Sequence, residues 1–252
     1  MRRLILSIFV IFLFFSCSHR LSLSRISTGN IQVNSQTSTV DSLVQSVITP
    51  YRDSIESDMS KLVAVSASPL KKGKPESKLT DLIADILLES GTEYCKANKL
   101  NITPEISYVN YGGLRASLPQ GNITVGNLFE LMPFENEIVL IKISGEAVRQ
   151  MADQIAARGG EGISGFKLGI RNEKAGKLTI NGKDVDPEAS YWLVTNDYVA
   201  NGGDQMSMFA NPAERINTKL KIRDDLITAL GARYKKSGII TVNEDGRIYN
   251  EY

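Results

Sequence analysis

Two short glycine-rich segments, each directly after a run of β-prone residues, constrain the fold of this sequence more than any other feature. The first is NYGGLR at residues 110–115, and the second is NDYVANGGD at residues 196–204. Glycine has no Cβ and tolerates positive φ, so a Gly-Gly pair lets the backbone turn sharply and approach a ligand closely. Both segments therefore predict loops at the ends of strands, where binding residues are often found.

The remaining elements predict an α+β fold, in which a mixed β-sheet is covered by helices, because helices and strands alternate without a regular βαβ repeat. Apolar spacing at three and four residues indicates helices, and alternation or short apolar runs indicate strands. Pro50 is expected to kink or divide the first helix. The predicted helices lie near residues 40–59, 77–95, 124–131, 144–158 and 223–236, and Gly159 and Gly160 end the fourth of them. The predicted strands lie near residues 62–69, 106–109, 137–143, 165–171, 177–180 and 191–195.

The N-terminus is typical of an export signal, because Arg2 and Arg3 precede an apolar run at residues 4–15. This run is too short to span a membrane as a mature helix. Ser16 before Cys17 resembles a bacterial lipoprotein cleavage site, and the alternative is an ordinary signal peptide with an incidental cysteine. We expect lipidation at Cys17 and a protein exported and lipid-anchored on the periplasmic or cell-surface side of a bacterial membrane.

The predicted organisation is therefore a signal peptide at residues 1–16, a flexible tether at 17–38 that is rich in small polar residues, and a domain with an N-terminal helix at 39–252. The 29 basic and 28 acidic residues nearly balance, which argues against a nucleic-acid polymer as partner. Cys95 is the only other cysteine, so no intrachain disulfide framework is available. It lies within a helical pattern and is predicted to be buried.

The side chains beside the glycine pairs can recognise a small polar molecule. Asn110 can donate and accept, Arg115 carries a cationic fork suited to phosphate or carboxylate, and Asp204 offers two acceptor oxygens. Phe134 and Tyr198 are aromatic faces suited to stacking on a planar base. Each has an ordinary structural alternative, because Gly-Gly pairs are usually turns, an aspartate after glycine often caps a turn, and an apolar ring is often core.

In this order, and with PFEN at residues 133–136 between them, the two glycine segments resemble the C-terminal, substrate-binding domain of the 5'-nucleotidase and UDP-sugar hydrolase family. The resemblance covers roughly residues 62–230. It implies that Asn110 and Arg115 contact polar substrate groups, Phe134 and Tyr198 sandwich the base, and Asp204 meets the ribose. The predicted substrate-binding residues are Asn110, Gly112, Gly113, Arg115, Phe134, Asn136, Tyr198, Gly202, Gly203 and Asp204.

The sequence departs from the family in the loop before the helix that begins near Ser77. Family members commonly place a phosphate-binding arginine there, whereas this chain has Lys71, Lys72 and Lys74. Lysine lacks the bidentate fork of arginine, so weaker phosphate binding is expected, with Lys72 or Lys74 as the candidate replacement. The alternative is a solvated surface loop.

The resemblance also implies that hydrolysis belongs to a separate metallophosphatase domain with two metal ions held by His, Asp and Asn side chains. This sequence has one histidine, His19, and shows neither a GxSxG elbow nor a P-loop. Asp224 and Asp225 lie in the first turn of a helix, where the helix dipole favours negative charge. We expect no catalytic residue, metal site or cofactor in this chain, which would be inactive alone.

The function expected from these features is recognition of a nucleoside or nucleotide for phosphoester hydrolysis by a separately encoded dinuclear metallophosphatase subunit. Divalent metals are expected only in that partner. One alternative is a surface lipoprotein that captures nucleosides without any hydrolytic role. Another is a structural lipoprotein whose pocket is no longer used.

Overall fold

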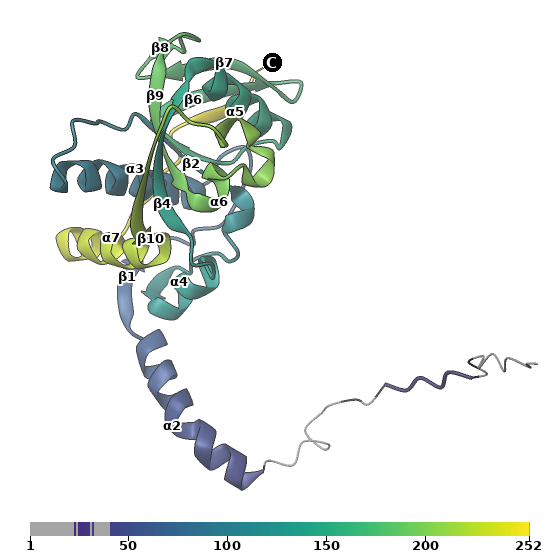
Figure 1. Cartoon of the computed structure of the whole chain (residues 1–252). Helices are drawn as coiled ribbons and strands as arrows, with labels where there is room; N and C mark the ends of the chain where they lie inside the picture. Colours follow the sequence, from purple (N-terminus) through teal and green to yellow (C-terminus); the bar gives the residue numbers. More distant parts are fainter. Residues whose placement is uncertain (1–22, 24, 31, 33–40, 252) are drawn as a thin grey trace, which may run out of the picture. The chain divides into compact units, whose positions relative to one another are not determined.

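The computed structural model describes residues 23, 25–30, 32 and 41–251, and its contacts divide the chain into two compact units, residues 1–48 and 49–252 (Figure 1). The predicted signal peptide and Cys17 lie outside the described residues, as does most of the tether, so export and lipidation stay predictions. Within the described ranges, no helix combines the length and apolar character needed to cross a membrane.

The elements follow the predicted mixture of helices and strands. The helices are α2 (Ser42–Met59), α3 (Lys78–Ala97), α4 (Val125–Leu131), α5 (Gly145–Ala157), α6 (Asp197–Ala200) and α7 (Ile222–Ser237), with short 3₁₀ turns η1 (Tyr111–Gly113), η2 (Gly203–Gln205) and η3 (Ser207–Phe209). The strands are β1 (Leu62–Ser66), β2 (Ile106–Val109), β3 (Gly121–Thr124), β4 (Glu137–Ser144), β5 (Gly162–Ser164), β6 (Phe166–Arg171), β7 (Lys174–Ile180), β8 (Lys183–Asp184), β9 (Ser190–Asn196), β10 (Glu214–Lys221) and β11 (Ile248–Asn250).

The main sheet of the second unit has five strands in the order β10-β4-β9-β2-β5. It is mixed, because β2 pairs parallel to β9 while the other neighbours are antiparallel. A four-stranded sheet, β11-β6-β7-β8, and a two-stranded sheet, β1-β3, complete the fold. The predicted mixed sheet with covering helices is therefore confirmed, although the strands divide among three sheets rather than one.

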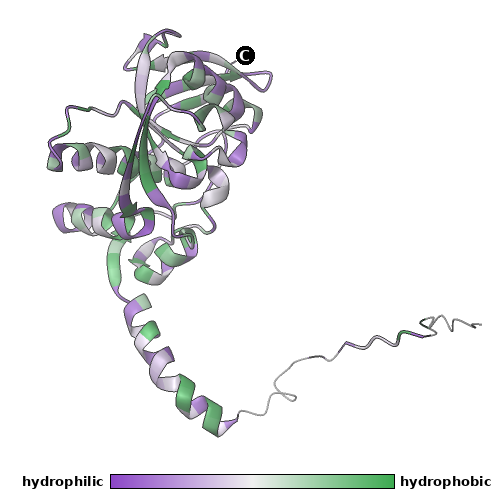
Figure 2. Ribbon diagram, in the orientation of Figure 1, coloured by the Kyte–Doolittle hydropathy of each residue, from purple (hydrophilic) through white to green (hydrophobic). Residues whose placement is uncertain are grey.

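Both faces of the main sheet are buried at the central strand β4, where successive side chains point to opposite faces and enter different apolar clusters. Along β4, Ile138 and Leu140 join the apolar cluster that includes residues of α3 and α7, whereas Val139 and Ile141 join the cluster that includes residues of α5. The long apolar stretches of the central strands are green in Figure 2. Burial on both faces explains why β4 reads as a continuous apolar run rather than as an alternating one.

Helix boundaries were well predicted where a side chain caps the first turn. Thr124 accepts a hydrogen bond from Asn127 N at the start of α4, and Ser144 accepts one from Ala147 N at the start of α5. The buried position of Cys95 in α3 is also confirmed. Pro50 was expected to kink or divide the first helix, and the second of these outcomes is wrong, because α2 is one helix that includes Pro50.

We predict opposite effects of adding one methyl group at two helical glycines. In Gly91→Ala, the new Cβ would lie 2.5 Å from the buried Val194 Cγ2, so the free energy of unfolding should fall by about 1–3 kcal/mol. In Gly231→Ala, the nearest atom to the new Cβ is 3.9 Å away, and the gain in helix propensity should add about 0.5–1 kcal/mol. Equilibrium urea unfolding measures both, and an unchanged Gly91→Ala would contradict the close packing of α3 on β9.

Candidate functional site

The two glycine-rich segments meet because the strands before them are parallel neighbours. β2 delivers the first glycine loop, residues 110–115, and β9 delivers the second glycine loop, residues 196–204. Parallel strands end at the same edge of a sheet, and loops beyond their carboxyl ends converge there. The antiparallel β4 begins at this edge, since Ile138 pairs with Asn196, and it brings residues 132–136 into the same region.

Hydrogen bonds connect the two residues that flank the segment at residues 132–136 to both glycine loops. Arg115 N donates to Leu131 O at 2.8 Å, which joins the first glycine loop to the end of α4. Glu137 N donates to Asp197 Oδ1 at 3.2 Å, which joins the start of β4 to the second glycine loop. These contacts hold the three segments together independently of any ligand.

A pocket of about 380 Å³ lies between the three segments, and eight of the ten predicted site residues line it. They are Asn110, Gly112, Gly113, Arg115, Phe134, Asn136, Tyr198 and Asp204. Gly202 and Gly203 are not among the lining residues. Gly202 adopts a φ of 88°, and a Cβ on Gly203 would lie 2.6 Å from the Tyr198 ring, so these glycines allow the turn and the close packing of the ring.

A chain of side-chain hydrogen bonds fixes the polar floor of the pocket. Asn196 Nδ2 donates to Asn110 Oδ1 at 3.0 Å, and Asn110 Nδ2 donates to Asp204 Oδ2 at 2.6 Å. Tyr198 OH donates to Asp204 Oδ1 at 3.1 Å. Each carboxylate oxygen has a second lone pair, so Asp204 can still accept a hydrogen bond from a ligand at both oxygens.

The aromatic and cationic groups at the pocket are exposed. Phe134 and Tyr198 each keep 48% of their surface accessible, so the alternative that Phe134 is a core residue is wrong. Arg115 is exposed as well and donates from Nη1 to Gly112 O at 3.1 Å. The fork therefore retains further donors for an anionic or carbonyl group.

Arg223 supports the Phe134 segment and was not singled out from the sequence. This arginine, whose side chain is 6% exposed, lies 3.9 Å from the centre of the Phe129 ring and donates to Met132 O at 3.3 Å and to the Glu135 carboxylate. The adjacent Ile222 N donates to Asn136 O at 3.0 Å. The only sequence signal was an arginine at the start of an amphipathic helix, which is ordinary on a surface.

Lys72 and Lys74, the candidate replacements for the family's arginine, bond main-chain carbonyls in this structure. Lys72 Nζ lies 3.9 Å from the centre of the Tyr111 ring and donates to Tyr111 O at 3.1 Å and Leu114 O at 2.7 Å. Burial, and then the charge of Arg115, lower the pKa of Lys72. Lys74 Nζ donates to Arg158 O. Neither lysine is among the lining residues.

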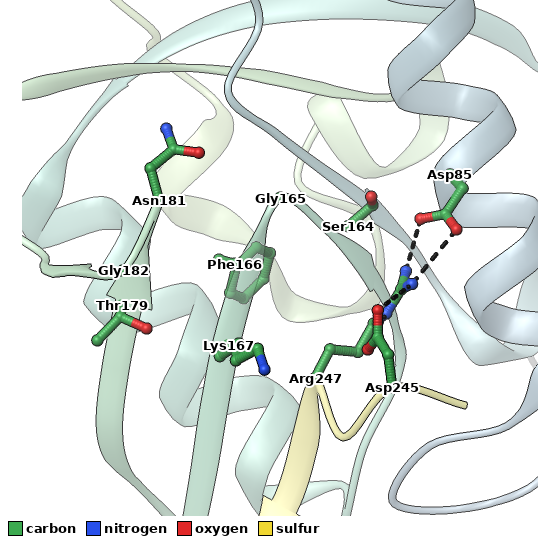
Figure 3. A pocket seen from close by; sticks show the side chains of 10 residues that line it. All are labelled: Asp85, Ser164, Gly165, Phe166, Lys167, Thr179, Asn181, Gly182, Asp245 and Arg247. Atoms are coloured by element: carbon green, nitrogen blue, oxygen red, sulfur yellow. Dashed lines mark hydrogen bonds and ion pairs between the residues drawn. The ribbon is translucent and has the colours of Figure 1, made fainter. Parts of the chain in front are cut away.

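A second cavity, of about 410 Å³, lies near the C-terminal strand and is lined by residues of β6, β7 and the segment before β11 (Figure 3). Its buried cation, Arg247, pairs with Asp85 at 2.6 Å and with Asp245 at 2.9 Å, and it donates to Ile163 O at 2.9 Å. The guanidinium of Arg247 is therefore engaged in contacts within the protein, and these contacts attach the start of β11 to α3 and β5. Lys167 is the other cation that lines this cavity.

Comparisons with known proteins agree with this architecture. The model of the family "5'-nucleotidase, C-terminal domain" matches residues 60–211. An apyrase of Tabanus yao is 31% identical over an alignment of 165 residues, and the match covers 57% of this chain and 29% of the apyrase. A trifunctional nucleotide phosphoesterase of Bacillus subtilis is 28% identical over an alignment of 150 residues, and the match covers 53% of this chain and 10% of that protein.

A solved structure gives the same fold. The 5'-nucleotidase precursor from Thermus thermophilus superposes with a TM-score of 0.69 and 22% sequence identity, covering 83% of this chain and 43% of that chain. This chain spans less than half the length of each relative named here. Since the family match covers more than half of the sequence and the fold agrees, this chain belongs to the 5'-nucleotidase C-terminal domain family.

Proposed function

We propose that this domain binds a nucleoside or nucleotide in the pocket between the glycine loops. In this proposal it supplies substrate recognition for phosphoester hydrolysis by a separate dinuclear metallophosphatase subunit. The observation that carries the proposal is the convergence of eight predicted residues, from three separate segments, around one pocket of about 380 Å³.

The chemistry of the lining suits the parts of a nucleoside. The exposed faces of Phe134 and Tyr198 can stack on a base, an interaction worth about 1–3 kcal/mol for each base. Asp204 can accept hydrogen bonds from two ribose hydroxyls, because Asn110 and Tyr198 occupy only one acceptor position on each oxygen. Arg115 can meet a phosphate or another polar substituent.

We assign hydrolysis to a metal centre in another subunit, because the pocket residues do not provide a set of metal ligands. Two-metal phosphoester hydrolysis uses a pair of ions to activate water and stabilise the leaving oxygen. The sequence contains a single histidine, and the described part of the chain has no group of three or more His, Cys, Asp or Glu side chains arranged to hold a metal ion. The Bacillus relative is named a nucleotide phosphoesterase, and only a tenth of that protein is matched.

One observation favours a second candidate function, the capture of nucleosides without hydrolysis. Lys72 and Lys74 donate to main-chain carbonyls, and Arg115 is the cationic residue that lines the pocket. A lining with one cation and one carboxylate suits a ligand with little net charge. Calorimetric titration with adenosine and with AMP, each with and without the metallophosphatase subunit, separates the two functions. If the domain serves hydrolysis, AMP is turned over only when the subunit is present. If the domain only captures nucleosides, adenosine binds and the subunit has no effect.

The first prediction of the proposal concerns turnover. The purified chain should release no phosphate from AMP in the presence of Mg²⁺, Mn²⁺ or Zn²⁺, because two-metal chemistry needs a ligand set that this chain does not supply. Adding the metallophosphatase subunit should restore phosphate release, measured by a colorimetric phosphate assay. If the chain alone released phosphate from AMP in a metal-dependent reaction, and Asp204→Ala abolished that release, the assignment of hydrolysis to a separate subunit would be contradicted.

The second prediction concerns the ribose. Asp204→Ala should weaken adenosine binding by about 1–3 kcal/mol, because it removes a charged acceptor. The wild type should bind 2',3'-dideoxyadenosine more weakly than adenosine, whereas Asp204→Ala should not discriminate between them. Calorimetry measures the affinities, and Asp184→Ala, an exposed residue of β8, is the matched control. Equal adenosine affinities for wild type and Asp204→Ala would show that the pocket assignment is wrong.

The third prediction concerns Lys72. Because its ammonium group donates to two carbonyls of the first glycine loop, Lys72→Met should lower the free energy of unfolding by about 1.5–3 kcal/mol. Lys71→Met, which changes the adjacent exposed lysine, should leave stability nearly unchanged. Urea unfolding measures both. Wild-type stability in Lys72→Met, together with a selective loss of AMP over adenosine binding, would instead support a role in phosphate binding.

A further inference from the structure

Beneath the pocket, a buried carboxylate connects the first glycine loop to the end of α5. Glu161 is 5% exposed and accepts a hydrogen bond from Tyr111 N. Its other oxygen lies 3.6 Å from Arg158 Nη1. Arg158 is the C-cap residue of α5, so this pair joins a rigid helix end to the loop that presents Gly112, Gly113 and Arg115 to the pocket.

Arg158 also reaches the second glycine loop. Its Nη2 atom donates to the main-chain oxygen of Asp204, whose carboxylate lines the pocket. Asp204 has φ 49° and ψ 41°, the left-handed region that side-chain-bearing residues seldom adopt. A residue in this conformation depends on surrounding contacts to hold it, and Arg158 supplies one of them.

The segment that carries Arg158 and Glu161 has little room to move. A Cβ on Gly160 would lie 2.0 Å from Pro75 O, and Gly160 has φ 119°. Lys74 Nζ donates to Arg158 O from the same neighbouring loop. Residues 158–161 are therefore enclosed between the loop before α3 and the two glycine loops.

We propose that Glu161 and Arg158 are positioning residues that hold the two glycine loops in their binding arrangement, and that neutralising the Glu161 carboxylate weakens ligand binding. The inference rests on the proposed function for its ligand. It assigns to this site a regulation by pH that acts through the loops rather than through a group in contact with the ligand.

The surroundings of Glu161 make this charge sensitive to pH. Burial is the largest influence and raises the pKa of the carboxyl, an effect opposed by the Tyr111 N–H, Arg158 and Lys74 and reinforced by Asp204. Lys72, in the loop before α3, is a further charge near it. Tyr108 stays neutral, because burial raises the pKa of its hydroxyl well above the usual value, and that hydroxyl has no hydrogen-bond partner among the described residues.

The sign of the effect follows from the raised pKa. At a pH above the pKa of Glu161, the ionised carboxylate attracts Arg158 and accepts a charge-assisted hydrogen bond from Tyr111 N. As the pH falls through this pKa, the carboxyl group becomes neutral and its attraction to Arg158 is lost. The hydrogen bond by which Arg158 supports the main chain of Asp204 then weakens. Affinity should therefore be high near neutrality and should fall on acidification, over a range that begins above the usual pKa of glutamate.

The experiment compares the full chain with Glu161→Gln, which keeps an acceptor oxygen and cannot ionise. Calorimetry with adenosine, from pH 8 down to the lowest pH at which circular dichroism shows the protein folded, should show the wild type losing affinity by about tenfold, as expected when one charge-assisted interaction weakens. Glu161→Gln should bind about tenfold more weakly at neutral pH and change little with pH, so that the difference in affinity between the two proteins narrows as the solution is acidified. Parallel pH profiles for the two proteins would overturn the inference.

Glu188→Gln, at an exposed position, is the matched control and should retain the wild-type profile. Glu161→Asp keeps the charge and should restore part of the pH dependence, which a purely structural role would not. Circular dichroism at each pH confirms folding.

Hydrogen exchange at neutral pH gives a readout that needs no ligand. In Glu161→Gln, amide protection should fall at residues 110–115 and 202–206. If adenosine does not bind the wild type, the proposed function is wrong. Reduced protection in Glu161→Gln would still support the coupling, by which Glu161 and Arg158 hold the two glycine loops in place. Unchanged protection at both loops refutes the coupling itself.

Discussion

The hydrogen bond between Asn110 and Asp204 is the contact on which the candidate site depends. It spans the two glycine loops, and Asn196 holds the other end of the same amide. Asn110 is 4% exposed, so breaking this bond would leave a buried polar group unpaired, which costs far more than the bond itself contributes. The parallel pairing of β2 with β9 makes the contact possible, because it brings the two strand ends to one edge of the sheet.

Around this contact, supporting and ligand-directed groups differ in burial. Lys72, Arg158 and Arg223 are cations whose donors are directed at main-chain oxygens, where they hold the loops in place. Phe134 and Tyr198, in contrast, leave about half of their surfaces exposed at the pocket. A pocket held by charged side chains bonded to the backbone is preorganised, so less conformational entropy is lost when a ligand binds.

Much of the fold could be predicted because its signals are local. The strand at Ile106–Val109, the caps Thr124 and Ser144, and the long apolar run of β4 all follow from short stretches of sequence. The edge strand β10 was not predicted, because half of its residues are charged and most are exposed, so its two apolar residues, Ile216 and Leu220, give only a weak signal. Its pairing with β4 is a long-range contact. The division of the strands among three sheets was not predicted for the same reason, because the spacing of apolar residues along a strand does not show which other strand it pairs with.

The side chains able to recognise a ligand could be identified from the sequence, because residue type and the neighbouring glycines define local chemistry and loop geometry. The folded domain was needed to show that eight of these residues line one pocket, and that Gly202 and Gly203 instead shape the turn beside Tyr198. The structure also shows that Lys72 donates to carbonyls of the first glycine loop and that the buried Glu161 accepts a hydrogen bond from the same loop. The physical reason is that hydrogen-bond partners and burial depend on segments far apart in the chain, which meet only when the sheet forms.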